Sequence, residues 1–538
     1  MTERIADDRQ PIPPVDTDTG PPFILRGRIV TMARDGVIND GLLLIEGGFI
    51  RRVLRHPDPI PDSFKKVPVT DTGSTLFPGL IDLHGHRGYN ICTLWNVPEL
   101  YANRNEWDSE ASYSSNVKQP AYAISQHPPT ARAMVRYVEA KAIMQGTCAG
   151  QGTFIRGLNT NDMRLRGAMR NVEETNDPRL PEAGSMVPDL AINSQQKRAD
   201  FEASLANRQA YFYHLSEGVD AQTRERFIEL ETHDLLSSSL VGIHGLALEE
   251  QDYVRLKSAG AKIVWSPYSN YLLYGETLSL AQVLASGVPI SLGCDWSPTG
   301  SKGLLEELKV ARITADEQNA PLTDEDLVRM VTTTPAYTLG WDHLVGSIQP
   351  NRLADIVAID GIQGNPYTQL IQAREPDVQL VAIHGIGRYG NQEILSQTIP
   401  SIRPPDASVE SCEVAGVSKA FYLYSGNSVI NDVSVGAARK VLTDALADLY
   451  HFKEQEAVAG LAPMDAADAF IVVLDEMSPD SEAANDDAPG IVPLAPPMAE
   501  SILLDSMFVD EQHIDAIRAQ RNVPPSITAN LLASYGVA

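Results

Sequence analysis

Several features are scarce in this sequence of 538 residues, and each scarcity argues against a class of protein. The 4 cysteines, Cys92, Cys148, Cys294 and Cys412, form no CxxC pair, so we expect neither a disulfide framework nor a thiolate zinc site. No apolar run approaches the ~18 residues of a membrane span, and the polar N-terminus holds no apolar leader segment. We therefore expect a cytoplasmic protein without a membrane partner.

Basic residues are also scarce, since 43 Lys and Arg stand against 70 Asp and Glu, for a formal net charge of −27. Nucleic acids and anionic bilayers are polyanions, so this charge disfavours both as partners. Apolar residues make up 43% and charged residues 21%, which is typical of a globular chain with a large core. The length predicts about two to four domains.

Strand-like and helix-like segments alternate through the middle of the chain. Compact apolar runs occur at YFYHLSEG, LVGIHG, AKIVWSP and PISLGCDW, and helical patterns such as AQTRERFIELETHDLL and ALEEQDYVRLKSAG lie between them. This alternation is typical of parallel β/α units. It suits a (β/α)8 barrel, whose active site forms at the strand C-termini, but a doubly wound open sheet predicts the same alternation.

Four histidines stand at the ends of apolar runs. FPGLIDLHGH ends in His84 and His86, which share one face of a strand because residues i and i+2 point the same way. His214 lies in YFYHL, His244 ends LVGIH, and Asp295 follows PISLGC. A single strand-end histidine is more typical of a structural residue. In a parallel barrel, however, these side chains would converge, and such a set suits zinc or a related divalent ion.

Glu217 follows His214 by three residues, just past the predicted strand. A carboxylate beside an activated water can carry a proton to a leaving group, and we favour this role over that of a charge at a helix N-terminus. Ser266, Ser269 and Asn270 occur without a GxSxG elbow, so we expect them to shape loops beside the metal rather than to act as nucleophiles.

Six segments together resemble the amidohydrolase superfamily, and within it the chlorohydrolase and aminohydrolase branch. They are FPGLIDLHGH, YFYHLSEG, LVGIHG, KIVWSPYSNYLLYGET, ISLGCDWSPTGSKGLLEELKVA and LVGSIQPNRLADIVAID, within a resemblance that runs from about Phe23 to Gln392. It implies an α/β fold, with a (β/α)8 TIM-type barrel over residues 79–344. It also implies a small β-sandwich domain assembled from residues 22–78 and 345–400.

The two ends of the chain lie outside this resemblance. Residues 1–21 are expected to form a disordered tail. Residues 401–538 hold 7 Lys and Arg against 21 Asp and Glu, and we expect an acidic, partly helical extension of unknown role.

The resemblance also implies roles for the site residues. The matched ligands of one divalent ion per chain, for which we expect Zn²⁺ with Fe²⁺ or Mn²⁺ as alternatives, are His84, His86, His214 and Asp295. His244 matches the residue that orients the attacking water, and Glu217 matches the proton carrier. Asp295 matches a residue that also accepts a proton from the water. Lys197 does not end an apolar run, so we expect no bridging lysine and no second ion.

The implied reaction is hydrolysis of a C–N bond in a small molecule, namely an amide, a cyclic amide or a ring amidine. The alternatives are deamination or dechlorination of an N-heterocycle, and an inactive barrel that serves as an assembly scaffold. A homo-oligomer is expected. The long loop over residues 89–116 is a candidate lid or substrate wall. GIGRYG, residues 385–390, formally matches a nucleotide-binding loop, but no helical segment follows it, so we favour a β-turn.

Overall fold

The computed structural model describes residues 20–158, 167–175, 177–186, 192, 194–404, 407–426, 428–449, 469–475 and 502–537. Nearly all of the tail predicted for residues 1–21 lies outside the described residues. Among the described helices, none is both long enough and apolar enough to cross a bilayer.

Two groups of parallel strands form the centre of the molecule. The first group is β5 (Leu80–Asp82), β6 (Thr147–Gly150) and β8 (Arg170–Asn171). The second is β9 (Gly184–Met186), β10 (Tyr211–Leu215), β11 (Leu240–His244), β12 (Lys262–Trp265) and β13 (Ile290–Leu292).

The two groups of strands meet at both of their edges. A parallel bridge joins Gly85 to Asp295 at one edge, and the N–H of Ala183 donates to the carbonyl of Val172 (2.9 Å) at the other. All five residues of β10 and of β11 are buried, which explains their near-continuous apolar sequence. The alternating pattern read from the sequence therefore belongs to a TIM-barrel type of fold.

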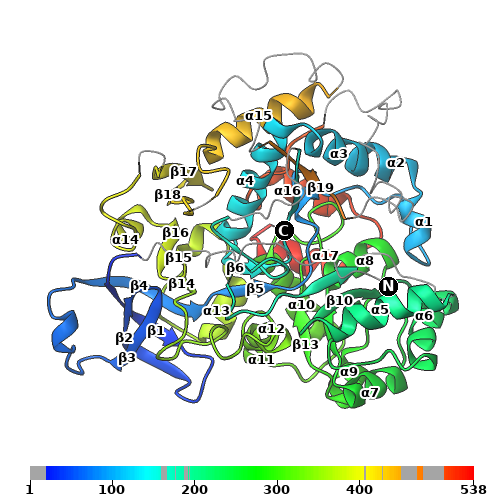
Figure 1. Ribbon diagram of the computed structural model, residues 1–538, viewed down its shortest axis with the longest axis horizontal. Coiled ribbons are helices and arrows are strands. Elements are labelled where there is room, and N and C mark those ends of the chain that lie inside the picture. Colours follow the sequence, from blue (N-terminus) through cyan, green and yellow to red (C-terminus); the bar gives the residue numbers. More distant parts are fainter. Residues whose placement is uncertain are drawn as a thin grey trace, which may run out of the picture.

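Helices surround these strands, as Figure 1 shows in cyan and green. They are α4 (Pro128–Met144), α5 (Gln195–Ala206), α6 (Ala221–Thr232), α7 (Glu250–Ala259), α8 (Pro267–Tyr274), α9 (Leu280–Ser286), α10 (Leu304–Glu317), α11 (Asp324–Arg329) and α12 (Thr333–Leu339). The ends of α7 follow from its sequence. Asp252 accepts a hydrogen bond from the N–H of Glu249 (3.0 Å) at its start, and Gly260, with φ of 78°, ends it in the left-handed conformation that glycine favours.

Both flanks of the barrel contribute to one nine-stranded sheet, which lies at the opposite end of the molecule from α5 and α6 (Figure 1). Its order is β17 (Glu410–Val414), β18 (Val417–Phe421), β16 (Ile386–Gly390), β15 (Val378–Ile383), β14 (Ile356–Asp360), β4 (Val69–Pro78), β1 (Phe23–Val30), β2 (Val37–Glu46) and β3 (Phe49–Arg55). The antiparallel pairing of β4 with β14 joins the two flanks.

The GIGRYG segment forms a hairpin in this sheet. β15 and β16 pair antiparallel, and His384 and Gly385 make the turn with φ of 53° and 69°. Only the five-residue helix α14 (Gln392–Ser396) follows. The β-turn interpretation is confirmed, and the geometry is not that of a nucleotide-binding loop, which leads from a parallel strand into a long helix.

The described parts of residues 401–538 pack on the rest of the chain. Strands β17 and β18 extend the large sheet, and β19 (Phe470–Val473) pairs with β7 (Phe154–Gly157). Helix α15 (Val435–Ala447) lies along α4 and contacts α3 (Gln119–Ser125), as the upper part of Figure 1 shows. Helices α16 (Glu511–Ala519) and α17 (Pro525–Ser534) contact each other, and α17 contacts α10.

Candidate metal centre

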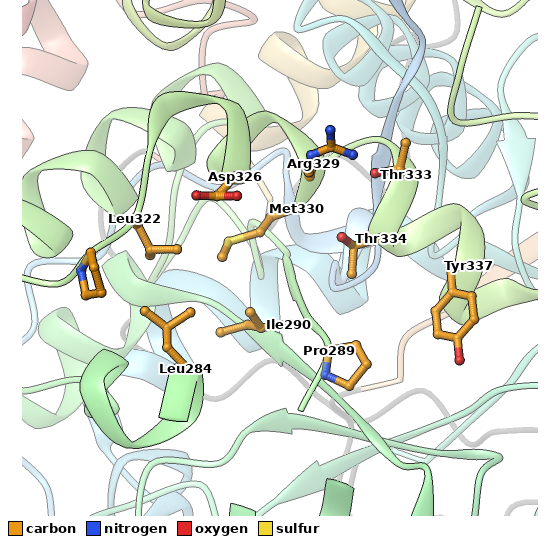
Figure 2. Close-up of a pocket in the computed structure, with 11 residues that line it drawn as sticks. Leu284, Pro289, Ile290, Leu322, Asp326, Arg329, Met330, Thr333, Thr334 and Tyr337 are labelled. Carbon is orange, nitrogen blue, oxygen red and sulfur yellow. The ribbon is translucent and has the colours of Figure 1, made fainter. Parts of the chain in front are cut away.

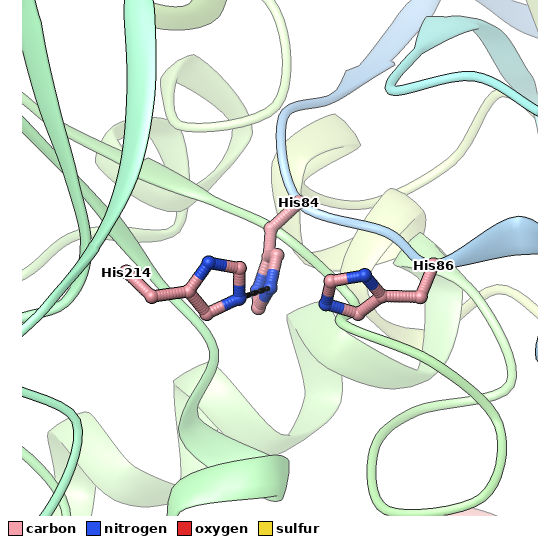
Figure 3. A group of neighbouring side chains, drawn as sticks. All are labelled: His84, His86 and His214. Atoms are coloured by element: carbon pink, nitrogen blue, oxygen red, sulfur yellow. Dashed lines mark hydrogen bonds between the residues drawn. The ribbon is translucent and has the colours of Figure 1, made fainter. Parts of the chain in front are cut away.

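The structure brings the six predicted site residues together at the carboxyl ends of the central strands. His84 and His86 follow β5, His214 lies on β10, His244 ends β11, and Asp295 follows β13. Glu217 follows β10. All six side chains are buried, and none of these residues is more than 4% exposed. Figure 3 shows His84, His86 and His214 with their rings turned toward one another.

The nitrogen and oxygen atoms at the centre of this cluster face one another at short range. His84 Nε2 lies 3.2 Å from His214 Nε2. Asp295 Oδ1 lies 3.4 Å from Nε2 of both His84 and His86. Three overlapping triplets of these side chains each have donor atoms within 4.8 Å of one another. Such a set of imidazoles and carboxylates is what a zinc-type site uses.

The outward nitrogens of three imidazoles are held by hydrogen bonds, and this sets the orientation of each ring. His84 Nδ1 lies 2.8 Å from Ser266 Oγ. His244 Nδ1 donates to Asn270 Oδ1 (2.9 Å), and His86 Nδ1 donates to Asp475 Oδ2 (2.9 Å). An Nδ1 that donates leaves the Nε2 lone pair directed to the centre, which is the arrangement found in metal-binding histidines.

The electrostatics of His84 and Asp295 agree with this arrangement. Burial, followed by the neighbouring imidazoles, lowers the pKa of His84 well below its usual 6.5, so the ring is neutral and can act as a ligand. Burial raises the pKa of Asp295 above its usual value, although the imidazoles of His86 and His244 oppose that shift. A bound cation would supply the positive charge that this buried carboxyl group otherwise lacks.

Helix α8 supplies three supporting side chains. Ser266 precedes the helix, and Ser269 and Asn270 lie on it. Ser269 Oγ donates to Asp295 Oδ2 (2.6 Å), and Asn270 accepts from His244. The sequence placed all three beside the metal but expected a loop. A helix forms because Pro267 fits the first turn and Gly275, with φ of 72°, ends it.

Glu217 sits at the edge of the cluster between a tyrosine, an arginine and a histidine. Tyr274 Oη donates to its Oε1 (2.7 Å), and Arg104 Nη1 donates to its Oε2 (3.4 Å). His244 Nε2 lies 3.8 Å from Oε2. Burial raises the pKa of Glu217, but His244, Arg104 and Tyr274 outweigh burial, and the net pKa is below the usual value. The side chain is therefore a carboxylate at neutral pH.

Three residues at this edge of the barrel have backbone conformations that are unusual for their type. Ser216, His244 and Asp295 have φ of 52°, 65° and 62°, the left-handed region that glycine favours. Each follows or ends a central strand. Such strain, on the order of 1–3 kcal/mol per residue, persists where the surrounding structure requires it and is concentrated at functional sites.

Arg104 and Asp475 are among the residues at the site that were not found from the sequence. Arg104 begins the short helix α1 (Arg104–Asp108) in the predicted lid loop, and the N–H of Val219 donates to Ala102 (2.7 Å), which holds that loop beside Glu217. Asp475 comes from the C-terminal extension and contacts His86. Neither lies in a strand-end pattern, so the signal that revealed the histidines could not reveal them.

A pocket on the barrel surface lies at the other end of β13 (Figure 2). Its lining includes Pro289 and Ile290, at the start of the strand, whereas Asp295 lies beyond the strand's end. Asp326 in this pocket caps α11 by accepting from Thr323. TIM-barrel active sites lie at the carboxyl ends of strands, so this pocket is not the candidate site.

The fold and the site together define a class of protein. Its members are parallel barrels that carry a cluster of histidines and carboxylates at the carboxyl ends of the strands. The model of the Amidohydrolase family matches residues 75–387, more than half of the chain. The protein belongs to the amidohydrolase family, and the resemblance inferred from the sequence is confirmed.

Two curated relatives illustrate the similarity. A 5-methylthioadenosine/S-adenosylhomocysteine deaminase of Syntrophobacter fumaroxidans is 26% identical over 219 residues, which are 37% of this chain and 50% of the relative. The chain thus spans about half the length of that protein. A 5'-deoxyadenosine deaminase of Methanothermobacter thermautotrophicus is 24% identical over 415 residues, which are 68% of this chain and 96% of the relative.

Solved structures support the fold. An adenosine deaminase from Xanthomonas campestris with bound zinc has a TM-score of 0.55 at 18% identity, over 73% of this chain and 96% of that one. A triazine hydrolase from Arthrobacter aurescens has a TM-score of 0.56 at 18% identity, over 69% of this chain and 95% of that one. At this level of identity the likeness establishes the fold alone.

Proposed function

We propose that this protein is a metal-dependent hydrolase that cleaves a C–N bond of a small molecule, by hydrolytic deamination of an amino-substituted N-heterocycle. The observation that carries this proposal is the convergence of four buried histidines with Asp295 and Glu217 at the mouth of an amidohydrolase-family barrel.

The proposed ligands of one divalent ion are His84, His86, His214 and Asp295. When bound, a Zn²⁺ ion would polarise a water molecule so that it attacks as a nucleophile near neutral pH. His244 would orient that water, because its ring is fixed by Asn270 and its Nε2 faces the cluster. Lys197, which lies in α5 away from the strand ends, gives no support for a second ion.

Glu217 is the proposed proton carrier. It rests as a carboxylate, so it can accept a proton from the attacking water, and Tyr274 and Arg104 hold it in place. It would then release that proton to the departing nitrogen, which leaves as ammonia. Asp295 is the second proposed acceptor of a proton from the water.

Deamination is favoured here over the amide cleavage that the sequence first suggested. The curated relatives are named as deaminases of 5-methylthioadenosine, S-adenosylhomocysteine and 5'-deoxyadenosine, all of which carry an amino group on a purine ring. Several buried aromatic side chains lie near the cluster. The Trp296 ring lies 5.2 Å from His86, and Tyr113 and Trp107 lie 5.9 and 6.3 Å from Trp296. These flat apolar side chains suit a planar ring.

The test is to supply the Zn²⁺-loaded full-length protein with adenosine-type nucleosides, amino-triazines and cyclic amides. Deamination releases ammonia with a shift of the ring's ultraviolet spectrum, whereas amide opening releases none from a hydantoin-type substrate. We expect ammonia from at least one amino-heterocycle. Activity on cyclic amides alone would favour the amidase alternative, and no turnover of any class would favour the scaffold alternative.

The role of Glu217 is tested in the same assay with Glu217→Gln. We expect kcat to fall by about 10²–10⁴-fold, because the amide cannot accept and return the proton, while the bound metal stays unchanged. Glu276→Gln, an exposed change just beyond α8, is the matched control and should keep wild-type activity. Full activity of Glu217→Gln would contradict the assignment.

Two predictions about the fold are also part of this proposal. We infer that the two groups of parallel strands close into one complete barrel, and that the nine-stranded sheet serves as the composite β-sandwich domain. A homo-oligomer and a cytoplasmic location stay predictions. Size-exclusion chromatography with light scattering measures the first of these directly.

A further inference from the structure

Asp475 of the C-terminal extension contacts the proposed metal centre directly. Its Oδ2 lies 2.9 Å from His86 Nδ1. The side chain of His86 is 3% exposed and that of Asp475 is 26% exposed. A carboxylate can only accept, so the imidazole donates from Nδ1 and directs its Nε2 toward the centre. Asp295 Oδ1 lies 3.4 Å from that Nε2.

Strand β19 determines where Asp475 lies. Phe470 to Val473 pair antiparallel with Phe154 to Gly157 of β7, soon after the second central strand, β6. Phe470 and Val472 are fully buried. Gln126 Nε2 donates to the carbonyl of Val472 (3.3 Å). Asp475 is thus two residues beyond an anchored strand.

The segment that follows His86 is built to receive this strand. A Cβ atom placed on Gly88 would lie 2.6 Å from Leu474 Cδ2, so a larger residue there would force the Leu474 side chain to move. The next part of the extension contacts the same segment, because the N–H of Asp505 donates to Ile91 (2.9 Å) and Cys92 forms an antiparallel bridge with Leu504. Residues 86–92 are therefore held by two stretches of the extension, 470–475 and 504–505.

Metal-binding histidines commonly donate their second ring nitrogen to a carboxylate, which fixes the ring and strengthens the ligand. We propose that Asp475 is a positioning residue that orients His86 for metal binding, so that the C-terminal extension completes the metal centre of the barrel. This inference rests on the proposed metal site, but it does not depend on the substrate. It gives the acidic extension a specific role.

The test measures Zn²⁺ affinity by competition with a chromophoric chelator, using the full-length chain and the variants Asp475→Ala, Asp475→Asn and Asp475→Glu. We expect the dissociation constant to rise about 10–100-fold in Asp475→Ala. Asp475→Asn, which keeps an acceptor but loses the charge, should fall between that variant and wild type, and Asp475→Glu should recover part of the affinity. Glu413→Gln, an exposed carboxylate of the extension in β17, is the control and should bind as wild type.

A second readout separates positioning from folding. The visible absorption of the Co²⁺-loaded protein reports the ligand geometry and should change in Asp475→Ala, while the thermal unfolding of the metal-free variants should match that of wild type. If Asp475→Ala does not fold, Asp475→Asn, which has nearly the same shape, still decides the question. Wild-type affinity and an unchanged Co²⁺ spectrum in a folded variant would overturn the inference.

The outcomes for this inference and for the proposed reaction are distinguishable. If the variants lose Zn²⁺ affinity but no substrate is hydrolysed, the positioning role stands and the proposed function fails. If wild-type protein deaminates a substrate and Asp475→Ala keeps both affinity and rate, the function stands and the positioning role fails.

Discussion

Two of the buried clusters of charged and ionisable side chains in the described part of the chain differ in how their charges are balanced. In the first, His84, His86, His214 and Asp295 direct nitrogen and oxygen acceptor atoms toward one point. The second is Asp505 between two lysines. Its Oδ1 lies 2.7 Å from Lys302 Nζ, and its Oδ2 pairs with Lys141 Nζ.

The two clusters differ in where the positive charge comes from. Lys141 also donates to Ser297 Oγ (2.7 Å), so the Asp505 cluster has its own cations and hydrogen bonds. In the histidine cluster burial lowers the pKa of His84 well below its usual value, and its Nε2 lies 3.2 Å from Nε2 of His214. A buried set of acceptors without a cation is costly. The difference supports the proposal that the first cluster holds a metal ion, whereas the second is a structural ion network.

The largest expected effect comes from removing a proposed ligand. Wild-type protein should hold about one equivalent of Zn²⁺ by elemental analysis, and His84→Ala should hold almost none, because Nε2 of His84 faces both His214 and Asp295. His343→Ala, an exposed histidine outside the cluster, should keep the metal. Two equivalents in wild type would mean that a bridging ligand exists, and equal metal in wild type and His84→Ala would place the ion elsewhere.

The next largest effect should come from a change in the Asp505 cluster, where two lysines neutralise the carboxylate. Asp505→Asn leaves the ammonium groups of Lys141 and Lys302 buried without a carboxylate, and breaking a buried pair in this way costs about 3–5 kcal/mol of unfolding free energy. The measurement is urea unfolding of the metal-free protein. Asp444→Asn, which removes an exposed partner of Lys440, should change stability by less than about 1 kcal/mol. A similar small effect for both variants would show that the cluster stabilises little.

Wild type and Asp505→Asn should also differ in how their unfolding free energy depends on pH. Burial raises the pKa of Asp505, but Lys141 and Lys302 outweigh it and lower the pKa to about 2, from the usual 3.8. A lowered pKa in the folded state means that the stabilisation is complete above the usual pKa and is lost as the pH falls through the folded value. The stability difference between wild type and Asp505→Asn should therefore be complete above about pH 5 and shrink from there toward pH 2. A difference that grows on acidification would contradict this account.

These clusters also show how far the sequence could predict the molecule. The histidine cluster could be predicted because its residues end apolar strands, and strand periodicity places them at the carboxyl edge of a parallel sheet. Asp475 and Asp505 could not, because each belongs to the extension and follows no periodic pattern. Their position depends on the pairing of β19 with β7 and of Leu504 with Cys92, which are contacts between segments far apart in sequence. The helix at Ser269 and Asn270 was not predicted, because these residues were expected in a loop, whereas Pro267 fits the first turn of a helix.

The smallest effect concerns His384, a buried histidine with no part in the proposed site. Burial, helped by Arg170, lowers its pKa to about 4 from 6.5. The unfolded chain then binds more protons between these values, so His384 costs stability as the pH falls from 6.5 to 4, by at most about 3 kcal/mol. His384→Asn keeps a residue type that tolerates the φ of 53° and removes the titration. Metal-free wild type should therefore lose more stability than this variant between pH 7 and 4, with His343→Asn as the exposed control. If the unfolding free energies of wild type, His384→Asn and His343→Asn fall equally between pH 7 and 4, burial of His384 does not disfavour its charged form.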